Sequence, residues 1–218
     1  MKNPLIILSI ALLSVTGASS LLADPIVFNF SPSQAAAGNV GLSEDYTSDA
    51  FTITAYGFVK SSGAQTSLYQ KYTPGNTAET GLGMGADSDH EIPGPYFVQL
   101  DVKNLIDAGF SSLTLSLGSL QRGEQANIYA DTSFGSFASG NTFLVGLVGL
   151  PEEMSTTVAL TSRYLNITGG GSGGADPVLQ SATASVPDGG STALLLGASV
   201  LGLAGYGRLR RSGVWHQS

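Results

Sequence analysis

The chain has 218 residues, of which 29 are glycine, 11% are charged and none is cysteine. The absence of cysteine excludes a disulfide framework, a thiolate metal site and a cysteine nucleophile. Residues 24–185 contain five basic and fifteen acidic side chains, a net charge of about −10, which argues against binding to nucleic acid or anionic lipid through a basic patch.

The N-terminal segment has the three parts of a secretory signal peptide. Lys2 supplies a positive start, residues 5–15 form an apolar run, and small residues lead up to Ala23 before Asp24. The apolar run is shorter than the ~20 residues of a membrane-spanning helix, and the order of the parts is that of a cleaved leader. We therefore predict a signal peptide over residues 1–23. An ordinary buried helix or strand is the alternative.

The middle of the chain alternates apolar and polar residues over short stretches, most clearly at residues 97–102 and 113–117. This alternation suits strands that bury one face of a sheet and expose the other. The sequence therefore predicts an all-β domain over residues 24–185, an antiparallel, jelly-roll-like β-sandwich with a helical turn only at residues 102–108. The predicted strands are residues 26–30, 50–59, 66–72, 96–102, 112–117, 126–130, 142–148 and 156–160.

A glycine run interrupts the end of this domain. Residues 163–168 have a strand pattern, residues 169–174 read Gly-Gly-Gly-Ser-Gly-Gly, and an apolar pattern resumes over residues 175–184. The renewed pattern favours a final β-hairpin whose loop is the glycine run. In that case the domain extends to about Ala184. A flexible linker is the alternative for the glycine run.

The densest polar segment, residues 81–92, is interpreted as a glycine-flanked acidic loop. Asp87, Asp89 and Glu91 supply carboxylate oxygens at alternate positions, the ligand type that Ca²⁺ prefers. The loop lacks the twelve-residue pattern of an EF-hand. We predict these three residues as ligands if a cation binds, with a solvated acidic loop as the alternative.

The sequence offers few candidates for catalysis or for ligand stacking. It has two histidines, His90 and His216, and lacks a His-Glu-x-x-His helix. We therefore predict a protein that is not an enzyme, and a hydrolase would need His90 as its base. Aromatic residues that could stack on sugar rings are more often part of a core. They are Tyr56, Tyr69, Tyr72, Tyr96 and Phe134.

The C-terminus has a short signature, an apolar segment and a basic cluster. Residues 191–207 contain no charged side chain, and as a helix they cover most of a ~30 Å hydrocarbon core. The arginines that follow are costly to translocate, so they and a tail of residues 212–218 are expected in the cytoplasm. A buried helix of the domain is the alternative. The signature is Val186, Pro187, Asp188, Gly189 and Gly190, and the basic cluster at 208–211 contains Arg208, Arg210 and Arg211.

This tail of residues 186–211 resembles the PEP-CTERM family of sorting signals in the order of its parts, and its sequence is most similar to the VPDSG variant. It differs in having Gly190 where the variant has serine, and in continuing to Ser218. The resemblance implies recognition by an exosortase-like membrane protease and removal of the helix near Pro187 and Asp188. It further implies transfer of the remainder to the cell envelope or extracellular matrix, in association with exopolysaccharide. Pro187 would present the signature in an extended conformation.

Together these features predict an exported bacterial surface or matrix protein, held transiently in the inner membrane by residues 191–207. Its folded part is expected to be structural. A carbohydrate-binding module that depends on Ca²⁺ is the first alternative, and a hydrolase is the second. A simple tail anchor that is never cut is a further alternative for the C-terminus.

Overall fold

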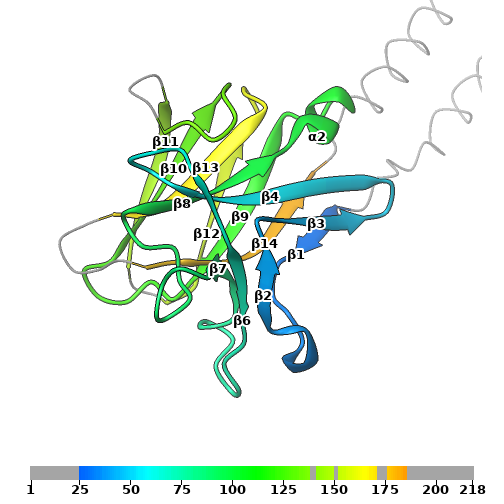
Figure 1. The fold of residues 1–218 in the computed structure, drawn as a ribbon. Coiled ribbons are helices and arrows are strands. Elements are labelled where there is room, and N and C mark those ends of the chain that lie inside the picture. The colour runs from blue at the N-terminus through cyan, green and yellow to red at the C-terminus, as the bar shows by residue number, and fades with distance from the viewer. Residues whose placement is uncertain (1–24, 138–140, 150–151, 171–175, 186–218) are drawn as a thin grey trace, which may run out of the picture. The chain divides into compact units, whose positions relative to one another are not determined.

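Alternating apolar residues build two antiparallel sheets of seven strands each (Figure 1). The computed structural model describes residues 25–137, 141–149, 152–170 and 176–185. Two short helices accompany the strands, η1 (Gln34–Ala36) and α2 (Lys103–Asp107). The predicted all-β class and the two antiparallel layers of a sandwich are confirmed. The jelly-roll-like connectivity stays a prediction.

The first sheet, called sheet A, contains both the first and the last strand of the described chain. Its strands are, in spatial order, β12 (Met154–Ala159), β9 (Ser112–Gly118), β14 (Val178–Ala184), β7 (Gly81–Met84), β6 (Leu68–Lys71) and β2 (Gly38–Gly41), with β1 (Ile26–Asn29) paired to β14. β14 therefore has β9 on one side and both β1 and β7 on the other. The pairing of β1 with β14 sets Ile26 opposite Ala184.

The second sheet, called sheet B, carries the longest strand. Its strands are, in spatial order, β11 (Thr142–Val148), β10 (Gln125–Asp131), β13 (Tyr164–Gly170), β8 (Tyr96–Asp101), β4 (Phe51–Val59) and β3 (Ser43–Ser48), with β5 (Gln65–Thr66) paired to β4. The chain crosses repeatedly between the sheets, so strands that are neighbours in sequence often belong to opposite layers.

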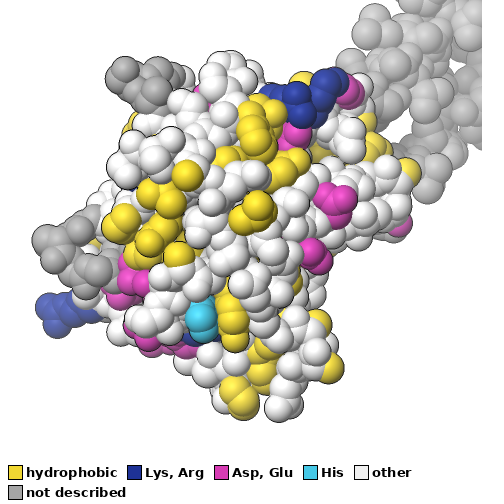
Figure 2. Space-filling model, in the orientation of Figure 1, with side chains coloured by type: hydrophobic (Ala, Val, Ile, Leu, Met, Phe, Trp, Pro, Cys, Tyr) yellow, Lys and Arg dark blue, Asp and Glu magenta, His cyan; other side chains and the backbone are white. Residues whose placement is uncertain are grey.

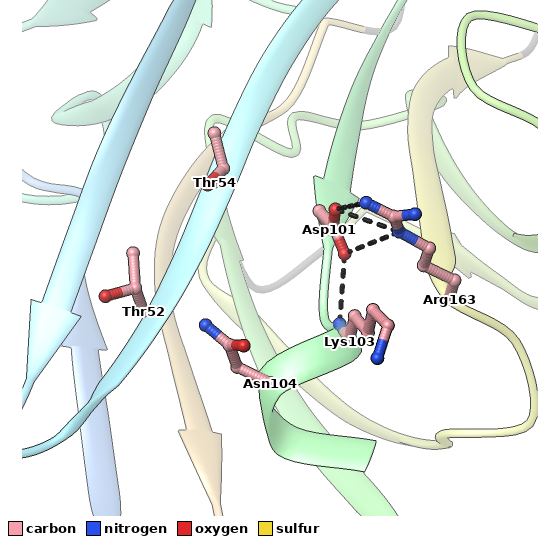
Figure 3. Close-up of a pocket in the computed structure, with 6 residues that line it drawn as sticks. All are labelled: Thr52, Thr54, Asp101, Lys103, Asn104 and Arg163. Atoms are coloured by element: carbon pink, nitrogen blue, oxygen red, sulfur yellow. Dashed lines mark hydrogen bonds and ion pairs between the residues drawn. The ribbon is translucent and has the colours of Figure 1, made fainter. Parts of the chain in front are cut away.

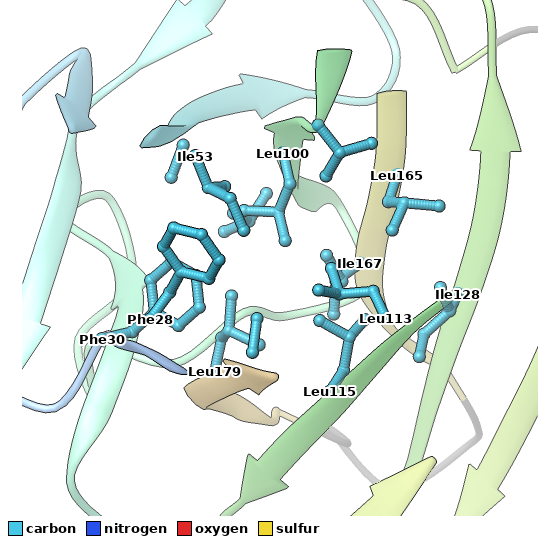
Figure 4. Close-up of a cluster of buried hydrophobic side chains, with 14 of the residues drawn as sticks. Phe28, Phe30, Ile53, Leu100, Leu113, Leu115, Ile128, Leu165, Ile167 and Leu179 are labelled. Atoms are coloured by element: carbon cyan, nitrogen blue, oxygen red, sulfur yellow. The ribbon is translucent and has the colours of Figure 1, made fainter. Parts of the chain in front are cut away.

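The core consists of the inward-facing side chains of both sheets (Figure 4). On β9, Leu113, Leu115 and Leu117 are fully buried, while Thr114 and Ser116 between them are half-buried. This is the period of two that the sequence shows, and it places every second residue on the face that packs against sheet B. The labelled members in Figure 4 are Phe28, Phe30, Ile53, Leu100, Leu113, Leu115, Ile128, Leu165, Ile167 and Leu179.

The prediction that the last two strands pair as a β-hairpin is wrong. The segment after the glycine run does form a strand, β14, but β14 lies in sheet A while β13 lies in sheet B. β13 pairs with β10 and β8, and β14 pairs with β9, β7 and β1. The connection from Gly170 to Val178 is long enough to cross between layers, whereas a hairpin would need both strands in one sheet.

Several predicted segments lie outside the described residues. They include the signal peptide of residues 1–23, the signature of residues 186–190, the apolar segment of residues 191–207 and the basic cluster of residues 208–211. Among the helices of the described residues, none is long and apolar enough to span a bilayer.

Candidate functional site

The acidic loop after β7 is shaped by its own side chains. The carboxylate of Asp87 accepts hydrogen bonds from the backbone N–H groups of Asp89, at 3.0 Å, and Glu91, at 3.4 Å. His90 has a φ of 60°, and its ring stacks on Tyr69 with the centroids 3.6 Å apart. Figure 2 shows a histidine side chain, coloured cyan, at the surface, with acidic side chains close to it.

The side chain of Glu91 belongs to a different cluster. Its Oε1 lies 2.5 Å from Nζ of Lys71 and accepts a 2.6 Å bond from the Ser119 hydroxyl. Because one of the three carboxylates is used in this way, the structure does not bring the predicted ligands Asp87, Asp89 and Glu91 together. In the part of the chain that the structure describes, no group of three or more His, Asp or Glu side chains is placed to hold a metal ion. Calcium binding by the loop stays a prediction.

The cluster around Glu91 contains two carboxylates and one cation. Lys71 also contacts Glu79, with Nζ 2.7 Å from Oε2, and the hydroxyl oxygen of Ser119 lies 3.0 Å from Oε1 of Glu79. Burial raises the pKa of Glu91 to about 7, although Lys71 and Ser119 favour its ionised form. Burial also opposes ionisation of Glu79, but the bond to Lys71 holds the pKa of Glu79 below its usual value. The one ammonium group of Lys71 balances the charge of only one carboxylate. The two carboxylates together therefore take up one proton near neutral pH.

This lysine–glutamate cluster is suited to a structural role. Ser119 is 1% exposed, so its hydroxyl is not accessible to a substrate. The cluster ties together β6, the end of β9 and the loops after β6 and β7. Sequence reasoning missed it, because Lys71, Glu79, Glu91 and Ser119 are far apart in the chain and follow no common motif.

Aromatic side chains cover the outer face of sheet B, where an antiparallel sandwich would ordinarily expose polar residues to solvent. Their neighbouring ring centroids lie between 4.8 and 5.9 Å apart, in an unbroken path across the sheet. Phe134 and Phe143 are 51% and 55% exposed. We call this set the aromatic band. It consists of Tyr56, Phe58, Phe97, Tyr129, Phe134, Phe137, Phe143 and Tyr164.

A surface segment, residues 132–137, is fastened over the same face and brings two aromatic rings to it. Buried Gln99 donates to the carbonyl of Ser133 at 3.2 Å and accepts from the N–H of Gly135 at 3.0 Å. Gln99 also donates to Asn166 at 2.8 Å. These amide groups are buried and fully used, so they fix the segment and with it the exposed ring that it carries.

A shallow polar pocket of about 130 Å³ adjoins this band (Figure 3). Arg163 makes a forked ion pair with Asp101, with Nε 3.0 Å and Nη2 2.6 Å from Oδ2. The guanidinium carbon of Arg163 lies 4.9 Å from the ring centroid of Tyr164, so the pocket and the aromatic band are continuous. The pocket is lined by Thr52, Thr54, Asp101, Lys103, Asn104 and Arg163.

The pocket and band combine hydroxyl, amide, carboxylate and guanidinium groups with exposed aromatic surface. Pockets that enclose drug-sized ligands are about 300–1,000 Å³, so this one can hold only part of such a ligand. Of the aromatic residues predicted as stacking candidates, Tyr56 and Phe134 lie in the band. Tyr69 instead stacks on His90, and Tyr96 is the first residue of β8.

Comparison with known families bears on the C-terminus. The family model of the VPDSG-CTERM motif matches residues 185–210. The predicted resemblance to a PEP-CTERM-like sorting signal is therefore confirmed, and all residues of the predicted signature lie within the match. No match to the chain was found among the curated proteins or the solved structures.

Proposed function

We propose, from the VPDSG-CTERM motif, that the chain is an exported bacterial surface or extracellular-matrix protein whose tail is removed by an exosortase-like membrane protease. The motif, which is of the kind found in exported proteins, supports export. The single observation that carries the proposal is the match at residues 185–210, which begins directly after the last core strand ends at Ala184. A cut near Pro187 and Asp188 would therefore release the whole domain. The domain's role is then structural and non-enzymatic.

The proposal predicts that changing the signature blocks tail removal but not export. In a bacterium that carries an exosortase, the double variant Pro187→Ala/Asp188→Ala should be exported and keep its tail, because the extended acidic signature is lost. Mass spectrometry of both ends of the recovered protein checks this. The wild-type protein should begin near Asp24 and end near Pro187.

A matched control changes two residues beyond the basic cluster. The variant Ser212→Ala/Gln217→Ala should be processed like the wild type, since both positions lie outside the matched motif. Recovery of wild-type protein with residues 191–211 intact would contradict proteolytic sorting and would indicate a simple tail anchor. Full-length protein in the cytosol would contradict export itself.

The outer face of sheet B favours a second function, binding of a polysaccharide. Sugar rings present apolar C–H faces to aromatic rings and hydroxyl groups to polar side chains. Here exposed Phe134 lies beside Tyr56 and Tyr164, with centroid distances of 4.8 and 5.9 Å. The adjoining pocket supplies Asp101 and Arg163 for the hydroxyl groups. This observation supports a carbohydrate-binding domain on the cell surface.

Binding to a glycan array tests this second function. Phe134→Ala should weaken binding to any bound glycan by about tenfold, since a stacked aromatic contact contributes about 1 kcal/mol beyond its buried area. Val27→Ala is the matched control, because Val27 is nearly as exposed, at 48%, and lies on β1 of sheet A. Equal binding by the wild type and the Phe134 variant would eliminate the site. Loss of binding on adding a chelator would support the predicted dependence on Ca²⁺.

A further inference from the structure

The aromatic band has a second exposed ring on strand β11, away from Phe134. Phe134 contacts aromatic rings of both β4 and β13, so it lies over β8, the strand between them. Phe143 belongs to β11, three strands further across sheet B. With neighbouring strands about 4.8 Å apart, these two half-exposed rings are separated by about 14 Å. One sugar ring covers about one aromatic ring, so a single sugar cannot contact both.

Two half-buried amide side chains, those of Gln125 and Asn127, lie beside Phe143. They project from the outer face of sheet B, because they alternate with core residues along β10. A Cβ atom at Gly146 of β11 would lie 2.8 Å from Nε2 of Gln125 and 3.3 Å from Cζ of Phe143. Gln125 also donates to Asn127 at 2.9 Å. The glycine thus allows an amide pair and an exposed ring to lie together over the backbone of β11.

Both ends of the aromatic band therefore combine an exposed ring with polar groups. Phe134 contacts Tyr164, which borders the polar pocket, and Phe143 adjoins the amide pair. The half-buried rings of Tyr129 and Phe137, with centroids 5.1 Å apart, lie between the two ends. A sugar unit places its C–H face on an aromatic ring and its hydroxyl groups on neighbouring polar groups. Two such places joined by further rings fit successive units of one chain.

The charge of the domain favours an uncharged chain as the ligand. Residues 24–185 contain fifteen acidic and five basic side chains, so the domain repels a polyanion. Among the residues that the structure describes, two cations contact the band. Arg163 is paired with Asp101, and Lys60, 4.5 Å from the ring centroid of Phe137, has no carboxylate partner there. One unpaired cation is too few for a polymer that carries an acid on every unit, and a polycation would meet both positive charges.

We propose that the outer face of sheet B binds an uncharged, linear polysaccharide along its length, with the chain running across the strands from Phe134 to Phe143. This inference rests on the carbohydrate-binding function proposed above. It adds a second place for a sugar unit, at Phe143, Gln125 and Asn127, and it specifies the charge and the direction of the bound chain. The ligand is then an internal stretch of a polymer, rather than a single sugar.

Oligosaccharides of two lengths test the length and the charge of the ligand. The full chain is applied to an array that carries cello-, xylo-, manno- and laminari-oligosaccharides as dimers and hexamers, together with a guluronate hexamer, which has a carboxylate on every unit. At least one neutral hexamer should bind about tenfold more tightly than its dimer, because only the hexamer reaches both exposed rings. The guluronate hexamer should bind more weakly than this neutral hexamer.

Two variants test the second place for a sugar unit. Phe143→Ala should lower the affinity for the neutral hexamer about tenfold, to that of the dimer. Gly146→Ala should act in the same direction, because its methyl group displaces the flexible amide end of Gln125. Val27→Ala is the matched control, since Val27 is 48% exposed on β1 of sheet A, and it should bind like the wild type. Thermal unfolding of each variant confirms that the fold is kept.

The outcomes separate this inference from the function on which it rests. Absence of binding to every glycan on the array would overturn the carbohydrate-binding function and this inference with it. Equal affinity for dimer and hexamer, tightest binding of the guluronate hexamer, or a folded Phe143 variant that binds the hexamer like the wild type would overturn this inference alone.

Discussion

Gly83→Ala is expected to destabilise the domain by about 3 kcal/mol or more. Gly83 lies in the middle of β7, and a Cβ atom there would be 1.9 Å from the carbonyl oxygen and 2.7 Å from the carbonyl carbon of His90. Both atoms belong to backbone, so the loop must move and the 3.0 Å bond from the N–H of Met84 to the carbonyl of Glu91 is strained or lost. Overpacking of this kind costs about 1–3 kcal/mol and occasionally more.

Thermal unfolding followed by circular dichroism measures this effect. For a domain of this size the midpoint should fall by roughly 6–12 °C. Gly94→Ala is the matched control, because a Cβ at Gly94 has no neighbour closer than 4.0 Å and the backbone there is of ordinary conformation. It should leave the midpoint within about 2 °C. Equal midpoints for the Gly83 variant and the wild type would show that the loop does not pack on β7 as described.

Lys71→Met is expected to have the second large effect, and one that depends on pH. The change removes the cation from Glu79 and Glu91, whose carboxylates lie 2.7 and 2.5 Å from Nζ. Breaking a buried ion pair costs about 3–5 kcal/mol, and we expect about 3 kcal/mol here, since the side chains are 11–17% exposed. The loss should be largest at pH 8, where both carboxylates are ionised.

The pH dependence follows from the pKa of Glu91, which folding raises from its ordinary 4.5 to about 7. The folded chain therefore binds this proton more tightly than the unfolded chain. The stabilisation is fully present below pH 4.5 and is lost as the pH rises to about 7. Asp176, whose pKa burial and nearby acids raise to about 6, acts in the same direction. The wild type should thus unfold at a higher temperature at pH 5 than at pH 8.

In the Lys71 variant both carboxylates are more easily protonated, so most of the lost stability should return at pH 5. Unfolding midpoints of wild type and variant at pH 5 and pH 8 provide the measurement. Lys103→Met is the matched control: Lys103 pairs with Asp107, but their side chains are 53% and 58% exposed, and such pairs contribute less than about 1 kcal/mol. A Lys71 variant destabilised equally at both pH values would contradict the shared-cation description.

Strands with strict alternation could be predicted from the sequence, and strand β7 could not. The sequence of residues 81–92 predicts a glycine-flanked acidic loop, yet Gly81, Gly83 and Gly85 lie on one face of β7 and the turn after it. At each of them a Cβ would approach an atom of another segment to within 2.6 Å or less. Glycine at every second position is thus the signal of a strand against which other backbone packs closely.

The sorting signal could be predicted from the sequence because its parts follow one another in a single segment, residues 185–210. The polar pocket and the lysine–glutamate cluster were not, because they depend on which strands become neighbours. Asp101 and Arg163 meet only because β8 pairs with β13 in the observed register, in which Tyr164 lies opposite Asp101. Neither residue belongs to a motif, and a shift of two residues would separate them.

The place of β14 in sheet A has a consequence for the timing of folding during synthesis. This strand comes last among the described elements, yet β9, β7 and β1 all hydrogen-bond to it. Until Val178–Ala184 has left the ribosome, the N-terminal strand has no partner and one layer is divided in two. Sheet A therefore cannot be completed before the whole domain has been synthesised. The native structure can close only after the final strand arrives.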